Sequence, residues 1–380
     1  MVKFRSDAET VFAEIVEKAA PALLQPDHRI RRVVRQQTRT YIDRARAADS
    51  AAIDHAHLGG SATDVHVQQT DILFLRQRHG AGEPGLEVAG DAVDVAAAAV
   101  GGHGLHAPRA DVGDAEAVER AAELIEQKLG PIDIWINNAM NSVFCKFKEI
   151  NPQDFKRVTD VTYLGQVYGT MAALKRMLPR NRGSIVFVGS ALAYRGIPLQ
   201  SAYCGAKHAI QGFFDSLRCE LLNEKSKVQI TMVEMPALNT PQFNWVKSCL
   251  PNKPRPMGKI YQPEVAAKAV LYAATHNRRE IYVGYPTYQA IIGDKIAPWF
   301  ADIQLAKNGI KGQQMDQPRD PNRQNNLYEP VPGDMGAHGD FDDKAHDKSF
   351  MLWIAMNRQI FWGVVLLLIL LLLAVWMAFF

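Results

Sequence analysis

Residues 184–207 read SIVFVGSALAYRGIPLQSAYCGAK, and this stretch decides the fold. The apolar run 184–188 predicts a buried strand, at whose end Ser190 lies. Residues 201–223 predict a helix that begins soon after. Tyr203 and Lys207 are four residues apart, so they lie on one face of that helix, a turn from each other. The stretch therefore predicts a strand, a loop and a helix that bring a serine, a tyrosine and a lysine together.

These three residue types suit acid–base chemistry at a substrate oxygen. An ammonium beside a phenol favours the phenolate, so we expect Lys207 to lower the pKa of Tyr203. A phenol with a lowered pKa is a usable general acid or base near neutral pH. Ser190 is placed to polarise a substrate oxygen next to it. A Tyr-x-x-x-Lys pair alone is more often a chance pattern on a surface helix, but the serine at a strand end favours catalysis.

Working outward, residues 107–300 alternate strand-like and helix-like segments. This order is typical of an α/β fold in which helices cover a doubly wound, Rossmann-like parallel sheet. Helices are expected over 114–129, 154–177, 201–223 and 263–274, and strands over 132–136, 184–188, 228–234 and 281–284.

The motifs from Asp111 onward resemble those of the short-chain dehydrogenase/reductase family, over about residues 107–300. By this resemblance Ser190, Tyr203 and Lys207 are the catalytic serine, tyrosine and lysine. Thr162 stands where the family has a catalytic asparagine, so the family's proton relay does not carry over directly. The resemblance implies hydride transfer between NAD or NADP and a carbonyl or secondary alcohol, with Tyr203 as general acid/base.

The resemblance also assigns cofactor contacts. Asn137-Asn138-Ala139 resembles the family's Asn-Asn-Ala-Gly turn, with Met140 in place of glycine. Residues 235–240 resemble the segment that touches the nicotinamide, with Ala237 in place of glycine. The implied cofactor-binding residues are Asp111, Val112, Asn137, Ala139, Tyr203, Lys207, Pro236 and Thr240. The large apolar residues of 237–262 suit a small hydrophobic carbonyl or alcohol substrate, or equally a lid packed shut: Phe243, Trp245, Leu250, Met257 and Tyr261.

Residues 1–106 lack the family's glycine-rich phosphate turn. Gly80 to Gly85 fit G-x-G-x-x-G, but Glu83 would face the phosphates, and too few residues separate the motif from Asp111. The N-terminal βαβ unit is therefore anomalous or missing. Either this region diverged or was replaced, or the reading frame is shifted upstream of about residue 107. The poverty in aromatic residues and the abrupt return of family-like residues favour the shifted frame.

The C-terminal part predicts a tether and an anchor. Residues 301–350 are rich in Pro, Gly and Asp and suggest a loosely ordered tether. Within 351–380, the run 360–380 carries no charge and is long enough to span a bilayer. Lys344, Lys348 and Arg358 precede it, which predicts a single-pass anchor with the catalytic body on the cytoplasmic side.

Composition narrows the function classes. A formal net charge of +3 gives no reason to expect nucleic acid as a partner, and the arginine-rich run 29–46 is more simply a solvated segment. The four cysteines have no Cys-x-x-Cys spacing, so we expect neither a metal site nor a disulfide framework. The family resemblance implies a homodimer or tetramer. The main alternative to an enzyme is a catalytically impaired scaffold or interaction module without the cofactor loop.

Overall fold

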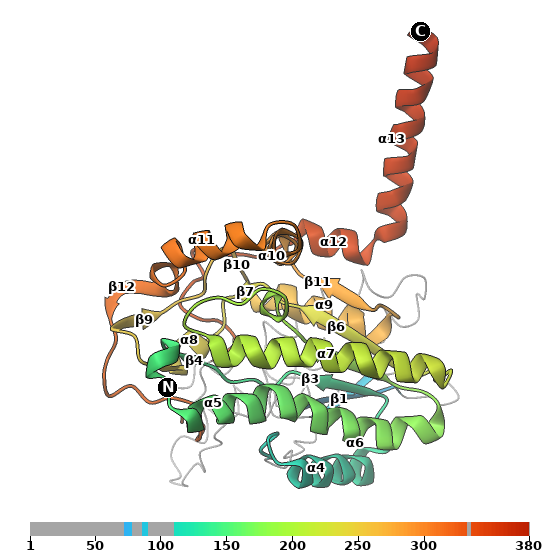
Figure 1. Cartoon of the computed structure of the whole chain (residues 1–380). Coiled ribbons are helices and arrows are strands. Elements are labelled where there is room, and N and C mark those ends of the chain that lie inside the picture. The colour runs from blue at the N-terminus through green and yellow to red at the C-terminus, as the bar shows by residue number, and fades with distance from the viewer. Residues whose placement is uncertain (1–71, 78–85, 90–109, 333–335, 380) are drawn as a thin grey trace, which may run out of the picture.

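The computed structural model describes residues 72–77, 86–89, 110–332 and 336–379 (Figure 1). The arginine-rich run and Gly80 to Gly85 lie outside these residues. The first described helix is α4, Ala115–Leu129, which Asp114 caps by accepting hydrogen bonds from the Glu116 and Ala117 amides.

A six-stranded sheet forms the centre of the molecule, in the order β11-β6-β5-β3-β1-β2. Four neighbours run parallel: β3 Ile134–Asn137, β5 Ser184–Val188, β6 Gln229–Glu234 and β11 Glu280–Tyr282. Helices connect them in sequence, so the predicted α/β fold with a parallel sheet is confirmed.

The other two strands depart from that pattern. β1, Ile72–Gln77, pairs with β3 in the antiparallel direction, and β2, Leu86–Ala89, pairs antiparallel with β1. A dinucleotide-binding unit needs a parallel strand there, leading into a turn and a helix. The predicted anomaly of the N-terminal unit is therefore visible as a hairpin at this edge of the sheet.

Helices cover both faces of the sheet, because successive strand residues point to opposite sides. Trp135 packs with the helices α4, α6 (Gly165–Arg180) and α7 (Ser201–Asn223) in one buried cluster. Ile134 and Ile136 pack on the other side with α9, Pro263–Thr275.

The long helix expected over 154–177 is present as one unbroken helical run, but it contains a π-helical turn that was not expected. The chain forms α5, Pro152–Thr159, then a π-helical turn at Asp160–Leu164, and then α6. The wider turn holds Thr162, whose hydroxyl exchanges hydrogen bonds with the backbone of Asn141. The backbone stays helical through the turn, so the helix continues from Pro152 to Arg180.

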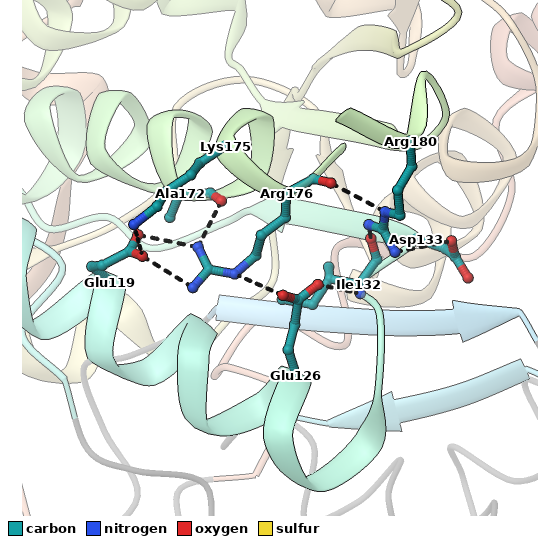
Figure 2. Close-up of polar contacts among 8 residues, drawn as sticks. All are labelled: Glu119, Glu126, Ile132, Asp133, Ala172, Lys175, Arg176 and Arg180. Atoms are coloured by element: carbon teal, nitrogen blue, oxygen red, sulfur yellow. Dashed lines mark hydrogen bonds and ion pairs between the residues drawn. The ribbon is translucent and has the colours of Figure 1, made fainter. Parts of the chain in front are cut away.

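An ion-pair cluster joins α4 to α6 and to the start of β3 (Figure 2). Arg176 donates to both carboxylate oxygens of Glu119 at 3.1 Å, and its Nε lies 3.2 Å from Glu126. Arg180 donates to the backbone oxygen of Ile132. The cluster fixes the outer helix α4 against the sheet.

The remaining short elements surround the carboxyl ends of the parallel strands. They are β4 Val143–Phe144, η2 Phe147–Glu149, η4 Ala191–Ala193, β7 Ala237–Leu238, α8 Gln242–Trp245, β8 Lys247–Ser248, β9 Asn252–Pro254, β10 Ile260–Tyr261, α10 Tyr285–Ile296, α11 Pro298–Asn308, η5 Lys311–Gln313, β12 Gln314–Pro318 and β13 Ala345–His346.

The expectation of a tether over 301–350 is corrected by the structure. β12 pairs with β9, β13 pairs with β10, and the side chains of Leu327 and Phe341 are buried. Some polar residues of the segment also bind buried groups of the body. Asn239, for example, donates to Asp342 at 2.8 Å.

Two helices end the described chain. α12, Phe350–Met356, is followed by α13, Arg358–Phe379, which projects away from the body (Figure 1). Within the described residues no single helix meets the length and hydropathy test for a membrane span. The pair Phe350–Met356 and Arg358–Leu370, bent by 97°, meets it by length and composition.

Candidate active site

Ser190 is fixed where β5 ends. It caps the short helix η4, its Oγ accepting a hydrogen bond from the Leu192 amide at 3.1 Å. The side chain is buried. The loop after the strand therefore holds the serine hydroxyl in one position.

Tyr203 and Lys207 face this serine from the first turns of α7. Lys207 is buried, and its Nζ donates to the backbone oxygen of Val188 at 2.6 Å. The same Nζ lies 5.5 Å from the centre of the Tyr203 ring. The Ser190 side chain lies close enough to the Tyr203 phenol to act on its pKa. The structure thus brings the three predicted residues together, and their catalytic roles stay predictions.

The expected lowering of the Tyr203 pKa is wrong for this state of the site. Burial raises the pKa of the phenol, and this effect outweighs the lowering by Ser190. Burial also lowers the pKa of Lys207 to about 8, against the attraction of Glu234. At neutral pH the phenol therefore keeps its proton.

Glu234 is a site residue that the sequence reasoning missed. It ends β6 with its side chain fully buried, and neither carboxylate oxygen accepts a well-formed hydrogen bond within the described residues. Gly189 leaves room for the carboxylate, which a Cβ at that position would strike. Burial first, and then the charge of Glu280, raise the Glu234 pKa to about 8. A glutamate that ends the strand QITMVE was the available signal.

Thr162 is buried but already engaged. Its hydroxyl donates to the Asn141 backbone oxygen at 2.9 Å and accepts from the Asn141 amide at 3.1 Å. Thr162 stands at the place of the family's catalytic asparagine, where the proton relay was not expected to carry over directly. Because its donor is used, Thr162 instead positions the loop after β3.

Four of the residues expected to contact the cofactor are Asp111, Val112, Asn137 and Ala139. Asn137 accepts from Trp135 Nε1 at 2.8 Å and donates to Thr170 at 3.0 Å, so it holds the strand end in shape. Val112 and Ala139 are buried beside it. Asp111 is more exposed and forms an ion pair with Arg157 at 2.7 Å.

The segment with Pro236 and Thr240 is held by the C-terminal part of the chain. Between them lies β7, which pairs with β10. Asn239 is buried and donates to Gln262 and Asp342 at 3.0 and 2.8 Å. The residues on both sides of Asn239 are thereby fixed.

The five large apolar residues of 237–262 mostly pack the lid shut. Phe243 and Leu250 are buried in a cluster with Phe144 and Phe341, and Tyr261 is buried against α9. Trp245 and Met257 are half-buried. The packing alternative therefore accounts for three of the five side chains.

A disulfide joins this lid to the loop after β4, contrary to the expectation that the cysteines form none. It links Cys145 to Cys249, whose Cα atoms are 4.9 Å apart. The two lie 104 residues apart in sequence, so spacing gave no hint of the bond. Of the other cysteines, Cys204 is buried and Cys219 exposed.

The site fits the nicotinamide end of a dinucleotide better than its phosphate end. Three of the family's polar groups converge at the carboxyl ends of β5 and β6, where ligands of parallel sheets bind. The strand that should lead into the phosphate turn runs antiparallel, as β1. In the described parts of the chain, no group of His, Cys, Asp or Glu side chains has the geometry of a metal site.

Comparison with known proteins matches residues 87–248 to the family described as short chain dehydrogenase. The chain is 34% identical over 230 residues to the uncharacterized oxidoreductase YxnA of Bacillus subtilis, covering 60% of this chain and 65% of that protein. It is 30% identical over 185 residues to dehydrogenase/reductase SDR family member 7C of Mus musculus, covering 48% and 60%.

A third relative is 3-dehydrosphinganine reductase of Danio rerio, 32% identical over 161 residues, which cover 42% of this chain and 48% of that protein. The chain thus spans between about half and two thirds of the length of these relatives. A solved short-chain dehydrogenase of Streptomyces avermitilis is 19% identical, with a TM-score of 0.41 over 53% of this chain and 80% of that one.

Proposed function

Because residues 87–248 belong to the short-chain dehydrogenase/reductase family, we propose that this chain is a membrane-anchored, NAD- or NADP-dependent oxidoreductase. Its substrate would be a small hydrophobic carbonyl compound or the corresponding secondary alcohol. The convergence of Ser190, Tyr203 and Lys207 at the end of β5 carries the proposal.

The chemistry divides between the cofactor and the side chains. A bound NAD(P)H supplies the hydride for the carbonyl carbon. The Ser190 hydroxyl holds the carbonyl oxygen, and the Tyr203 phenol gives that oxygen its proton, so the product is an alcohol. Lys207 stabilises the remaining phenolate until solvent returns the proton.

Before a cofactor binds, Tyr203 carries the proton that the reductive direction uses. A raised pKa keeps the proton on Tyr203 at neutral pH, as an acid that protonates a carbonyl oxygen requires. A relative named 3-dehydrosphinganine reductase agrees with carbonyl reduction. For this chain, reduction of a ketone is therefore the activity to test first.

A specific observation supports a second candidate, a catalytically impaired scaffold. The antiparallel β1 occupies the place of the strand that should lead to the phosphate turn. A chain without that turn would keep the body as an interaction module.

The remaining parts of the proposal concern location and assembly. The uncharged apolar run of α13 supports a bilayer anchor, with the body on the cytoplasmic side because Lys344, Lys348 and Arg358 precede it. Pairing through α6 and α7 into a homodimer or tetramer agrees with the exposed Met171 and Leu222 on these helices. No nucleic acid is proposed as a partner.

Titration of the purified full chain with NADH and NADPH, followed by nicotinamide fluorescence, tests the enzyme against the scaffold. We expect saturable binding with enhanced fluorescence for one of the two. Binding of neither at millimolar concentration would refute the enzyme and leave the scaffold. Reading the coding DNA upstream of codon 107 in all frames then tests whether a glycine-rich turn is encoded in another frame.

A further inference from the structure

Two helices after the last strand expose large apolar side chains. α11 buries none of its residues within the described structure, although it is rich in apolar ones. The exposed side chains lie on α10 and α11 and include two aromatic rings: Ile292, Ile296, Trp299, Phe300 and Ile303. A soluble surface rarely gathers so many large apolar groups without a partner.

α11 does not pack on the core. An open pocket of about 230 Å³ lies where α11 meets the body, lined by Leu305 of α11 and by Gly196 and Pro198 of the loop that follows Ser190. The helix is held to that loop by Arg195, which pairs with Asp294 and Asp302 at 2.8 and 2.5 Å. The apolar side chains named above are therefore exposed to solvent instead of packed on the body.

The same end of the molecule carries α12 and the start of α13. Figure 1 shows α10, α11 and α12 along the end of the body from which α13 projects. α12 exposes Phe350 and Trp353, and it meets α13 at 97°. If α13 follows the membrane normal, α12 lies in the membrane plane.

The charged side chains of α10, α11 and the residues after them bear on which partner this surface suits. Asp294 and Asp302, the only acidic residues of α10 and α11, both pair with Arg195, which offsets one of their two negative charges. Lys307 follows Ile303 by one turn on the same helical face, and Lys311 is close behind. Neither lysine has an ion pair within the described residues. Aromatic and aliphatic side chains beside free lysines suit the interface of an anionic bilayer.

We propose that α10, α11 and α12 form a docking face that lies flat on an anionic phospholipid bilayer, with the exposed side chains of α11 in the headgroup region. This attachment goes beyond the proposed anchor, because it fixes how the body is oriented on the membrane. It does not depend on cofactor binding or turnover.

The test uses the full chain with single fluorescent labels. Position 303 is labelled with an environment-sensitive dye as Ile303→Cys in a Cys219→Ser background, where the other cysteines are bridged or buried. Arg120→Cys, on the exposed face of α4, is the matched control, and Leu367→Cys reports α13. Each protein is reconstituted in vesicles of phosphatidylcholine and phosphatidylglycerol with spin-labelled lipids as quenchers.

We expect the emission at position 303 to shift to the blue and to be quenched by lipids labelled near the headgroup, while position 120 stays water-like. This result supports the docking face whether or not position 367 is quenched, so the anchor is judged separately. A water-like label at position 303 overturns the proposal. A blue-shifted label that lipid does not quench also overturns it, since a second copy of the chain then covers the face.

Discussion

At the scale of single residues, the proton on Tyr203 decides the proposed chemistry. Removing the hydroxyl by Tyr203→Phe deletes the acid and leaves Lys207 and Ser190 in place. We expect turnover to fall at least about 100-fold, within the range for lost general acid catalysis. The dissociation constant of NADH or NADPH should stay nearly unchanged. Retained turnover in steady-state assays would exclude Tyr203 as the proton donor.

Glu234 makes stability depend on pH. Its pKa is raised from 4.5 to about 8 by burial, so the folded state keeps a proton that the unfolded chain has lost between these values. The free energy of unfolding therefore falls as pH rises from 4.5 to about 8. Glu234→Gln removes this ionisation, and we expect it to abolish the fall, on the order of 1–3 kcal/mol.

Denaturant unfolding across this pH range measures the effect. Glu224→Gln, an exposed glutamate at the end of α7, is the matched control and should follow the parent chain. Should the Glu234→Gln protein lose stability with pH as steeply as the parent, another group carries the dependence. The depressed pKa of Lys207 has its own effect, because it adds stability as pH rises above about 8.

At the scale of elements, the cluster of Figure 2 holds α4 on the sheet. The Arg176 side chain is 9% exposed and pairs with two carboxylates of α4. Arg176→Ala should lower the free energy of unfolding by about 2–3 kcal/mol, the range for hydrogen bonds to charged groups. Arg120→Ala removes only an exposed ion pair with Glu116 and should change the free energy of unfolding by less than about 0.5 kcal/mol. Equal effects of the two changes would contradict the assigned role.

His338 secures the C-terminal segment over Asn239. Partial burial is the largest single effect and disfavours its charged form, but the hydrogen bonds and negative charges of Glu264 and Asp342 together outweigh it and raise the His338 pKa above 6.5. Stabilisation is therefore complete below 6.5 and is lost as pH rises through the higher folded-state value. Hydrogen exchange at the Gly339 and Phe341 amides should speed up over that range in the parent chain. In His338→Gln the exchange rates of these amides should lack the part of the pH dependence that comes from the histidine. If the pH profile is the same as in the parent chain, His338 does not cause that dependence.

Some elements were predictable from local sequence and others were not. β5 and α7 have the predicted bounds, because an apolar run and a continuous helical pattern define them without distant contacts. The π-turn was missed because it depends on Thr162 meeting Asn141, a contact that no local pattern shows. Glu234 was passed over because a charged residue at a strand end reads as a surface position until its burial is known.

At the scale of the whole molecule, composition misjudged the C-terminal third. Pro, Gly and Asp indicated a tether over 301–350, yet Asp342 and Phe341 close over Asn239 in the site. A polar segment stays ordered when its side chains satisfy buried groups elsewhere in the fold. The candidate site, the lid over 237–262 and the segment with Phe341 and Asp342 therefore pack together. Dividing the sequence into consecutive domains separated them.

Two features of the whole molecule disagree on the side of the membrane. Basic residues before α13 predict a cytoplasmic body, whereas a bond such as Cys145–Cys249 persists in oxidising compartments. Since we propose the cytoplasmic side, we expect both cysteines to be thiols in the cell and to bridge after purification. Acid-trapped cells, denatured and treated with a maleimide-polyethylene glycol reagent, should then show all four cysteines tagged without prior reduction.

Cys249→Ser is the control, because it leaves three cysteines that are tagged with or without reduction. Only two tags on the parent chain before reduction would mean that the bridge exists in the cell, and the cytoplasmic orientation would then be wrong. The bridge closes a loop of 104 residues, for which restriction of the unfolded chain stabilises by up to about 4–5 kcal/mol. Purified, oxidised protein should therefore exceed Cys249→Ser in free energy of unfolding, which urea titration measures. An equal stability would show that the bond adds nothing to a lid already held by Phe243 and Leu250.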